Sequence, residues 1–146
     1  MDGKSAVEFP SRTRVHVALR VADVGKSTTF YETLFGQKPT KVRRGYAKFE
    51  VVEPAVNLTL NAADDVRVET GTISHFGIQV KGAAEVAKEH DRLKAAGLDP
   101  RVEEKTACCY AVQDKTWVRD PDGNEWEIFV VLQADVPMTS CVCEAP

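Results

Sequence analysis

The stretch Asp120-Pro-Asp-Gly-Asn-Glu-Trp-Glu-Ile-Phe129 predicts a sharp turn followed directly by a β-strand. Pro, Asp, Gly and Asn are preferred in tight turns, and the aromatic and β-branched residues after them favour a strand. Alternation along this strand places Glu125 and Glu127 on one face and Trp126 on the other. A carboxylate inside a fold needs a partner charge, which a metal ion would provide. Glu127 is therefore a candidate metal ligand.

The same order of elements occurs twice along the chain. Hydrophobic alternation and helical periodicity predict the strands Arg14–Val21, Tyr46–Val52 and Val56–Leu60 with the helix Ser27–Phe35, then the strands Ser74–Val80, Arg101–Glu103, Cys108–Val112, Trp117–Arg119 and Trp126–Val131 with the helix Ala83–Ala96. A strand, a helix and a run of strands in each half predict an α+β fold made of two βαβββ modules. We assign these modules to about residues 14–62 and 74–132 of a single domain, 14–132, between tails at 1–13 and 133–146.

Aligning the two halves brings two histidines into equivalent positions. Val15-His16-Val17-Ala18-Leu19 matches Ser74-His75-Phe76-Gly77-Ile78, so each histidine opens the first strand of a module. If the modules pair into one open barrel, both imidazoles can point into a shared cavity, where nitrogen and oxygen ligands suit a divalent metal. Taken singly, a strand histidine is more often a core or edge residue, and Glu127 alone fits a solvated position. The matched placement of His16 and His75, together with Glu127, favours a metal site.

The adjacent thiols of Cys108 and Cys109 are a second chemical signal. They lie in Thr106-Ala-Cys-Cys-Tyr-Ala-Val-Gln-Asp114, and neighbouring cysteines rarely form a relaxed disulfide with each other. Paired thiolates suit soft partners such as trivalent arsenic, cadmium or zinc. The alternative is that one thiol is a small buried side chain and the other follows from strand alternation. Cys141 and Cys143 either relay or trap a metalloid or have no such role.

Composition narrows the class of protein. The chain has 146 residues and a net charge of -3, which argues against a nucleic-acid surface. No apolar run is long enough to cross a bilayer and the start does not read as a signal peptide, so we expect a cytoplasmic protein. The cysteines cluster late in the sequence, which favours reduced thiols. His90 shares a helical face with Val86 and Leu93, which indicates a residue at the edge of the core.

The paired modules, the strand-opening histidines and the turn before Glu127 resemble the vicinal oxygen chelate superfamily, which includes glyoxalase I and the extradiol dioxygenases. This resemblance covers about Arg14 to Leu132. Within the superfamily, the chain is similar to the organoarsenical C-As lyases and the related cadmium-induced proteins. The stretches that carry this similarity are Arg20-Val-Ala-Asp23, Phe30-Tyr-Glu-Thr-Leu-Phe35, Arg44-Gly-Tyr-Ala-Lys-Phe49 and, above all, Thr106-Ala-Cys-Cys-Tyr-Ala-Val-Gln-Asp-Lys-Thr-Trp-Val118.

The resemblance implies an Fe(II)- and O2-dependent lyase for arsenic detoxification. Such an enzyme cleaves the carbon-arsenic bond of trivalent organoarsenicals, such as methylarsenite or reduced aromatic arsenicals, and releases inorganic arsenite. Carried over by position, His16, His75 and Glu127 hold the iron and act in catalysis, while Cys108 and Cys109 bind the arsenic. His16 departs from the pattern of the subfamily, which often has Gln at this position.

Two other readings come from different classes of protein. One is a thiol-based protein that sequesters arsenic or cadmium without breaking a bond. The other is a glyoxalase-like isomerase or a ring-cleaving dioxygenase, neither of which needs a soft dithiolate. The expected partner is a small trivalent organoarsenical, with no nucleic-acid or membrane partner. A homodimer is a further expectation, because paired modules can exchange partners.

Overall fold

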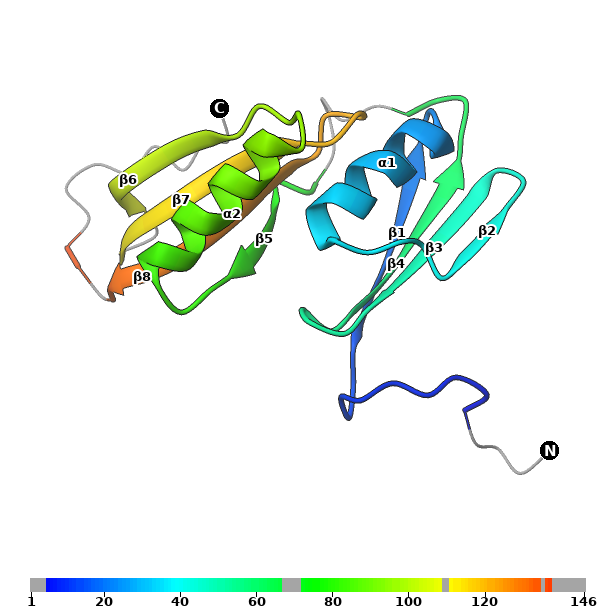
Figure 1. Cartoon of the computed structure of the whole chain (residues 1–146), viewed down its shortest axis with the longest axis horizontal. Coiled ribbons are helices and arrows are strands. Elements are labelled where there is room, and N and C mark those ends of the chain that lie inside the picture. The colour runs from blue at the N-terminus through cyan, green and yellow to red at the C-terminus, as the bar shows by residue number, and fades with distance from the viewer. Residues whose placement is uncertain (1–4, 67–71, 109–110, 135, 138–146) are drawn as a thin grey trace. The chain divides into compact units, whose positions relative to one another are not determined.

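The computed structural model describes residues 5–66, 72–108, 111–134 and 136–137. The chain divides into two compact units, Met1–Val66 (unit 1) and Arg67–Pro146 (unit 2). The described part of each unit contains one four-stranded sheet and one helix. Figure 1 labels these elements. The predicted α+β fold with two βαβββ modules is therefore confirmed. The pairing of the modules into an open barrel stays a prediction.

Unit 1 follows the predicted order of elements, with one additional short strand. Its elements are β1 (Val15–Val21), α1 (Val24–Phe35), β2 (Lys41–Arg43), β3 (Tyr46–Val51) and β4 (Val56–Ala62). The sheet order is β1-β4-β3-β2, with β1 parallel to β4 and the other pairs antiparallel. The helix begins before the predicted Ser27, because Asp23 caps it by accepting a hydrogen bond from the backbone N of Lys26 at 2.9 Å. It ends at Gly36, whose φ of 64° is left-handed.

The core of unit 1 lies between α1 and its sheet. The helix buries Phe30, Tyr31 and Leu34, and the Tyr31 ring lies 6.4 Å from the ring of Phe49 in β3. Burial of each such side chain contributes about 2 kcal/mol to folding. Because strand side chains alternate, the buried Leu19 of β1 and the exposed His16 point to opposite faces of the sheet. The face away from α1 is thus the polar face.

Unit 2 repeats this architecture. Its elements are β5 (Phe76–Gln79), α2 (Ala83–Ala95), β6 (Arg101–Cys108), β7 (Ala111–Arg119) and β8 (Glu125–Gln133). The sheet order is β5-β8-β7-β6, and β5 is parallel to β8. The helix packs on β7 and β8 (Figure 1) and buries Val86 and Leu93. The Glu85 carboxylate accepts a hydrogen bond from the backbone N of Gly82 at 3.1 Å, which satisfies a donor at the start of α2.

The predicted strand Cys108–Val112 is wrong. Cys108 ends β6, Ala111 begins β7, and the two residues pair with each other across the hairpin. β6 also extends past Glu103, where the predicted strand Arg101–Glu103 ends. A register shift between Glu103 and Thr106 marks a β-bulge, where Lys105 has a φ of 49° and its backbone N donates to Oδ1 of Asp114 at 2.7 Å. This bulge interrupts the alternation from which strands are predicted.

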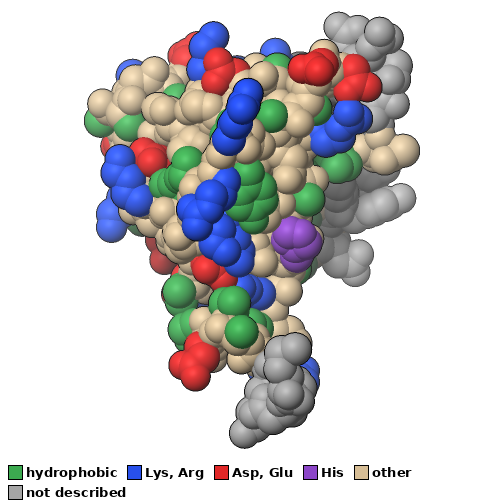
Figure 2. Space-filling view, turned by 90° about the vertical axis from the view of Figure 1, so that its right-hand side faces the viewer, with side chains coloured by type: hydrophobic (Ala, Val, Ile, Leu, Met, Phe, Trp, Pro, Cys, Tyr) green, Lys and Arg blue, Asp and Glu red, His purple; other side chains and the backbone are tan. Residues whose placement is uncertain are grey.

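Positively charged side chains gather on one face of the molecule (Figure 2). Figure 2 shows one face of the molecule, on which Lys and Arg side chains form a band beside hydrophobic side chains and a histidine. Among the described residues, no helix combines the length and the apolar character that crossing a membrane requires.

Candidate functional site

His75 and Glu127 lie next to each other in unit 2. Nε2 of His75 is 3.6 Å from Oε1 of Glu127. His75 immediately precedes β5, and the parallel pairing of β5 with β8 sets Gly77 opposite Glu127. A Cβ atom at Gly77 would lie 3.1 Å from Cγ and 3.3 Å from Oε1 of Glu127. The missing side chain therefore leaves the space that the carboxylate occupies.

Glu127 has a partner charge that the sequence interpretation missed. Nζ of Lys115, in β7, lies 2.9 Å from Oε2 of Glu127, and the two side chains are only 5% and 7% exposed. A buried carboxylate is stable when a hydrogen-bonded cation compensates its charge. The lysine engages Oε2 and leaves Oε1 facing His75. A signal was available, because the strand next to a buried carboxylate is where a compensating cation should be sought.

Trp117 completes this group of side chains. It pairs with Glu127 in the β7–β8 register. Its ring lies 5.2 Å from the His75 ring in an edge-on arrangement, and Nζ of Lys115 lies 5.2 Å from its centroid. The side chain is buried, and its Nε1 has no hydrogen-bond partner among the described residues. We call His75, Lys115, Trp117 and Glu127 the Glu127 cluster.

Glu125 shares the face of Glu127, as the alternation predicted, but has a different environment. Oε2 of Glu125 lies 2.9 Å from Nη2 of Arg101, and its Oε1 pairs with Arg119. Two guanidinium groups therefore satisfy this buried carboxylate, which makes it a structural ion-pair centre. The two acidic residues of β8 thus have separate roles, and Glu127 is the one beside an imidazole.

Each predicted histidine ligand has two ring nitrogens. A hydrogen bond donated by one of them leaves the other with a lone pair that can bind a metal. Nδ1 of His16 lies 3.0 Å from the backbone oxygen of Asn57. Because a carbonyl oxygen only accepts, a neutral His16 carries its proton on Nδ1 and keeps a lone pair on Nε2. Nδ1 of His75 lies 3.0 Å from Oγ of Ser74, whose hydroxyl can accept in the same way. Such a contact orients a metal-binding imidazole.

The donor atoms of the Glu127 cluster fit a divalent metal. An imidazole nitrogen and a carboxylate oxygen are ligands for first-row metals, and two bonds of about 2.1 Å can span the gap between them. His75 and Glu127 belong to unit 2 and His16 to unit 1. Within the described residues, no group of three or more His, Cys, Asp or Glu side chains could hold a metal. The described structure therefore brings two of the three predicted ligands together.

One of the two predicted arsenic-binding residues lies among the described residues. Cys108 is the last residue of β6, while Cys109, like Cys141 and Cys143, lies outside the described residues. From Ala111 to Lys115, β7 advances by about 13 Å, or four residues at the rise of an extended strand. A register irregularity between Val112 and Gln113 lies along this path. Since such irregularities bend strands, the pairing of β7 with β8 is not regular between Ala111 and Lys115.

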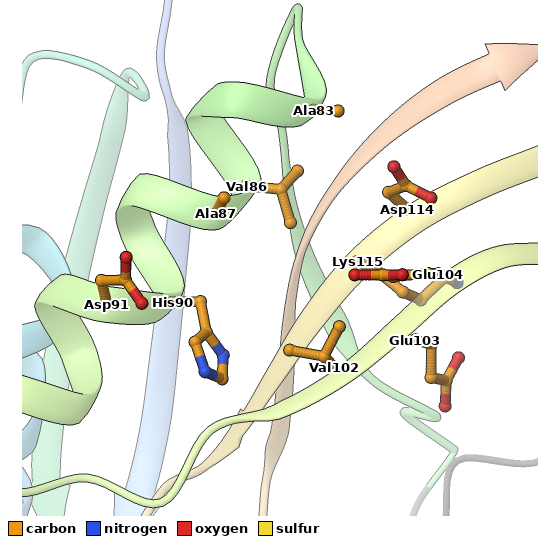
Figure 3. A pocket seen from close by; sticks show the side chains of 10 residues that line it. All are labelled: Ala83, Val86, Ala87, His90, Asp91, Val102, Glu103, Glu104, Asp114 and Lys115. Atoms are coloured by element: carbon orange, nitrogen blue, oxygen red, sulfur yellow. The ribbon is translucent and has the colours of Figure 1, made fainter.

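A cavity of about 180 Å³ lies between α2 and the β6–β7 edge of unit 2 (Figure 3). His90 from α2 and Val102 from β6 project toward each other across it. Nδ1 of His90 lies 3.1 Å from Oγ1 of Thr116, so Thr116 points toward α2. The ammonium of the adjacent Lys115 therefore points to the opposite face, toward Glu127. Lys115 itself also lines the cavity, which therefore adjoins the Glu127 cluster at this one residue. Half-buried His90 is a core-edge residue as predicted.

The polar face of unit 1 carries an ionic cluster of its own. Nη2 of Arg14 lies 2.6 Å from Oε1 of Glu50, and Nζ of Lys48 lies 3.3 Å from the same oxygen. The hydrogen bond from Arg14 is the main cause of a lowered pKa at Glu50; burial opposes it and Lys48 reinforces it. This carboxylate is therefore ionised through the neutral range.

The model of the Glyoxalase/Bleomycin resistance protein/Dioxygenase superfamily matches residues 13–128. A probable trivalent organoarsenical cleaving enzyme of Bacillus subtilis (strain 168) is 50% identical over 115 residues, which cover 79% of this chain and 77% of that protein. A trivalent organoarsenical cleaving enzyme of Bacillus sp. (strain MD1) is 45% identical over 135 residues, covering 88% and 83%. The crystal structure of a glyoxalase/bleomycin resistance protein/dioxygenase from Alicyclobacillus acidocaldarius has a TM-score of 0.69 at 17% identity, covering 84% and 93%.

Proposed function

Because the chain belongs to the glyoxalase/bleomycin resistance protein/dioxygenase superfamily, we propose that it is a lyase that cleaves the carbon-arsenic bond of trivalent organoarsenicals with Fe(II) and O2. Its substrates are methylarsenite and reduced aromatic arsenicals, and inorganic arsenite is the product. The names of its relatives support the substrate class. The observation that carries the proposal is the proximity of His75 and Glu127, because it offers a nitrogen and an oxygen donor side by side. A cytoplasmic location and a homodimer remain predictions.

The proposed ligands are His16, His75 and Glu127. Iron held by them would supply a place where dioxygen is bound and activated. Within unit 2, the role of the protein is to fix its donor atoms. Lys115 holds Oε2 of Glu127, and Ser74 orients the imidazole of His75 through Nδ1. One carboxylate oxygen and one imidazole nitrogen then face each other.

Cys108 and Cys109 are the proposed substrate ligands. Trivalent arsenic held by two thiolates loses its freedom to diffuse, so its carbon substituent is presented to the reactive centre as part of one molecule. Condensation of CH3As(OH)2 with two thiols releases two waters and no net proton, whereas a metal binds only neutral imidazoles. We therefore expect cleavage to fall on acidification.

Atom balance sets the products expected from methylarsenite. CH3As(OH)2 and O2 together contain the atoms of As(OH)3 and CH2O. One oxygen atom joins arsenic as the C–As bond breaks, and the other joins carbon. Arsenic stays trivalent, and the methyl carbon supplies the four electrons that reduce dioxygen. One formaldehyde should therefore accompany each arsenite.

The test is arsenic speciation after the reduced, Fe(II)-loaded protein is incubated with methylarsenite in air and under argon. We expect inorganic arsenite well beyond one equivalent in air and none under argon. Methylarsenite that stays intact and bound in a fixed ratio, with or without air, would contradict the lyase and favour sequestration of arsenic or cadmium.

Glu127→Ala separates binding from cleavage. We expect it to retain the arsenical through the thiols and to lower turnover by at least about 100-fold, the scale of removing a group that acts only in the reaction. Glu125→Ala is the matched control, because it removes a buried carboxylate from the same strand face, outside the proposed ligand set. Circular dichroism checks that both variants fold.

A further inference from the structure

Trp117 presents a buried donor with no acceptor. Its side chain is 4% exposed, and its indole Nε1 has no hydrogen-bond partner among the described residues. Buried polar atoms are almost always paired in native proteins, and an exception points to a ligand, an ion or a water that completes it. The position matters as well, because Trp117 lies opposite Glu127 in the sheet and edge-on to His75.

The side chains around Trp117 explain why the protein leaves this donor unsatisfied. Lys115 and Arg101, its neighbours along β7 and across to β6, carry donors and no acceptor. Glu127 could accept, but Lys115 binds its Oε2 and His75 faces its Oε1. The site thus offers an N–H donor beside two cations, Arg101 and Lys115, that are already paired with Glu125 and Glu127. The complementary partner is a small acceptor atom.

We infer that the indole N–H of Trp117 binds a small ligand at the Glu127 cluster by donating a hydrogen bond to its acceptor oxygen or nitrogen. The inference rests on the proposed function, since the metal that His75 and Glu127 would hold keeps such a ligand within reach. In the proposed reaction, dioxygen would supply such an acceptor oxygen. Trp117 is then a ligand-binding residue of the reactive centre, beyond the predicted metal and arsenic ligands.

The test uses Zn(II) as a diamagnetic substitute and azide as a small anionic acceptor. Trp117→Phe removes the N–H and retains an aromatic ring. Trp126→Phe is the matched control, because Trp126 is equally buried but stacks on Phe76 on the other face of the sheet. Calorimetry gives the affinities for Zn(II) and then azide, and nuclear magnetic resonance follows the indole N–H signals of the two tryptophans.

We expect unchanged Zn(II) affinity in both variants and azide affinity lowered about 3- to 10-fold in Trp117→Phe alone, the usual effect of one hydrogen bond. In the wild type, the indole signal that Trp117→Phe eliminates should shift when azide binds. Equal azide affinity for Trp117→Phe and the wild type, or a shift confined to Trp126, overturns the inference and leaves the lyase proposal intact. Failure of the wild type to bind Zn(II) is a different outcome, because it removes the metal site and the inference with it.

Discussion

Unit 1 and unit 2 share one topology but place different side chains at matched positions of their polar faces. When His16 is aligned with His75, Ala18 corresponds to Gly77. Ala18 lies opposite Thr59 in β4, whereas Gly77 lies opposite Glu127 in β8. The scaffold therefore provides a histidine in both units, but a carboxylate at this register only in unit 2. Duplication of a fold does not duplicate its site.

The charges on the two faces also differ in their exposure to solvent. In unit 1, the Lys48 and Glu50 side chains are 15% and 23% exposed. In unit 2, Lys115 and Glu127 are 5% and 7% exposed. Loss of one partner leaves a far less hydrated charge in unit 2. The comparison predicts that equivalent substitutions have unequal effects.

The largest difference is expected when each lysine is replaced by methionine. Lys115→Met leaves the Glu127 charge buried without its cation, and we expect a loss of about 3 kcal/mol in the free energy of unfolding. Lys48→Met should cost less than about 1 kcal/mol, since Arg14 still contacts Glu50 and solvent reaches the site. Urea denaturation of the metal-free proteins measures both values. Similar losses in the two variants would show that burial does not distinguish these ion pairs.

A smaller effect is expected when unit 2 receives the residue that unit 1 carries at the matched position. In Gly77→Ala, the new Cβ would also meet Cε1 of Phe129 at 3.2 Å. Movement of the Glu127 carboxylate alone would therefore not make room for it. Overpacking of this kind typically costs 1–3 kcal/mol, and we expect Zn(II) affinity to fall about 10-fold. Calorimetry provides the measurement.

Gly82→Ala is the matched control for this substitution. A Cβ at Gly82 meets nothing within 4 Å, so this variant should bind Zn(II) as the wild type does. Undiminished affinity in Gly77→Ala would mean that the carboxylate adapts, and that the bare glycine is not needed for metal binding.

The sequence predicted the fold where hydrophobic periodicity was regular. Both helices and the order of the modules were correct, because α1 and α2 bury residues at helical spacing and β3 alternates clearly. The prediction failed where local signals were weak or misleading. Lys41–Arg43 was missed because its three residues are all exposed and show no alternation. The end of β6 at Cys108 and the start of β7 at Ala111 were missed because the run Ala-Cys-Cys-Tyr-Ala contains neither Gly nor Pro.

The candidate site was predictable only in part. Strand alternation indicated Glu127 and the repeat indicated His75, and the structure places them together. The sequence interpretation assigned the partner charge of Glu127 to a metal, whereas the structure shows the Lys115 ammonium in contact with it. Lys115 and Trp117 escaped notice because their importance comes from antiparallel pairing with β8, a contact between strands that periodicity within one strand does not reveal.

The smallest expected effect concerns the pH dependence of the unit 1 ion pair. The pKa of Glu50 is lowered from 4.5, chiefly by the hydrogen bond from Arg14. A carboxyl group with a lower pKa in the folded state stabilises the fold above its unfolded pKa, and this contribution disappears as the pH falls through the folded value. Glu50→Gln should therefore cost about 0.5–1 kcal/mol at neutral pH and progressively less in the acid range below 4.5. Urea denaturation at pH 7 and at decreasing acid pH measures this difference, with Glu32→Gln as the control because its partner Lys38 is 86% exposed. A difference that stayed constant with pH would assign the effect of Glu50 to packing. The carboxylate charge would then not stabilise unit 1, in contrast to the ion pair of Lys115 and Glu127 in unit 2.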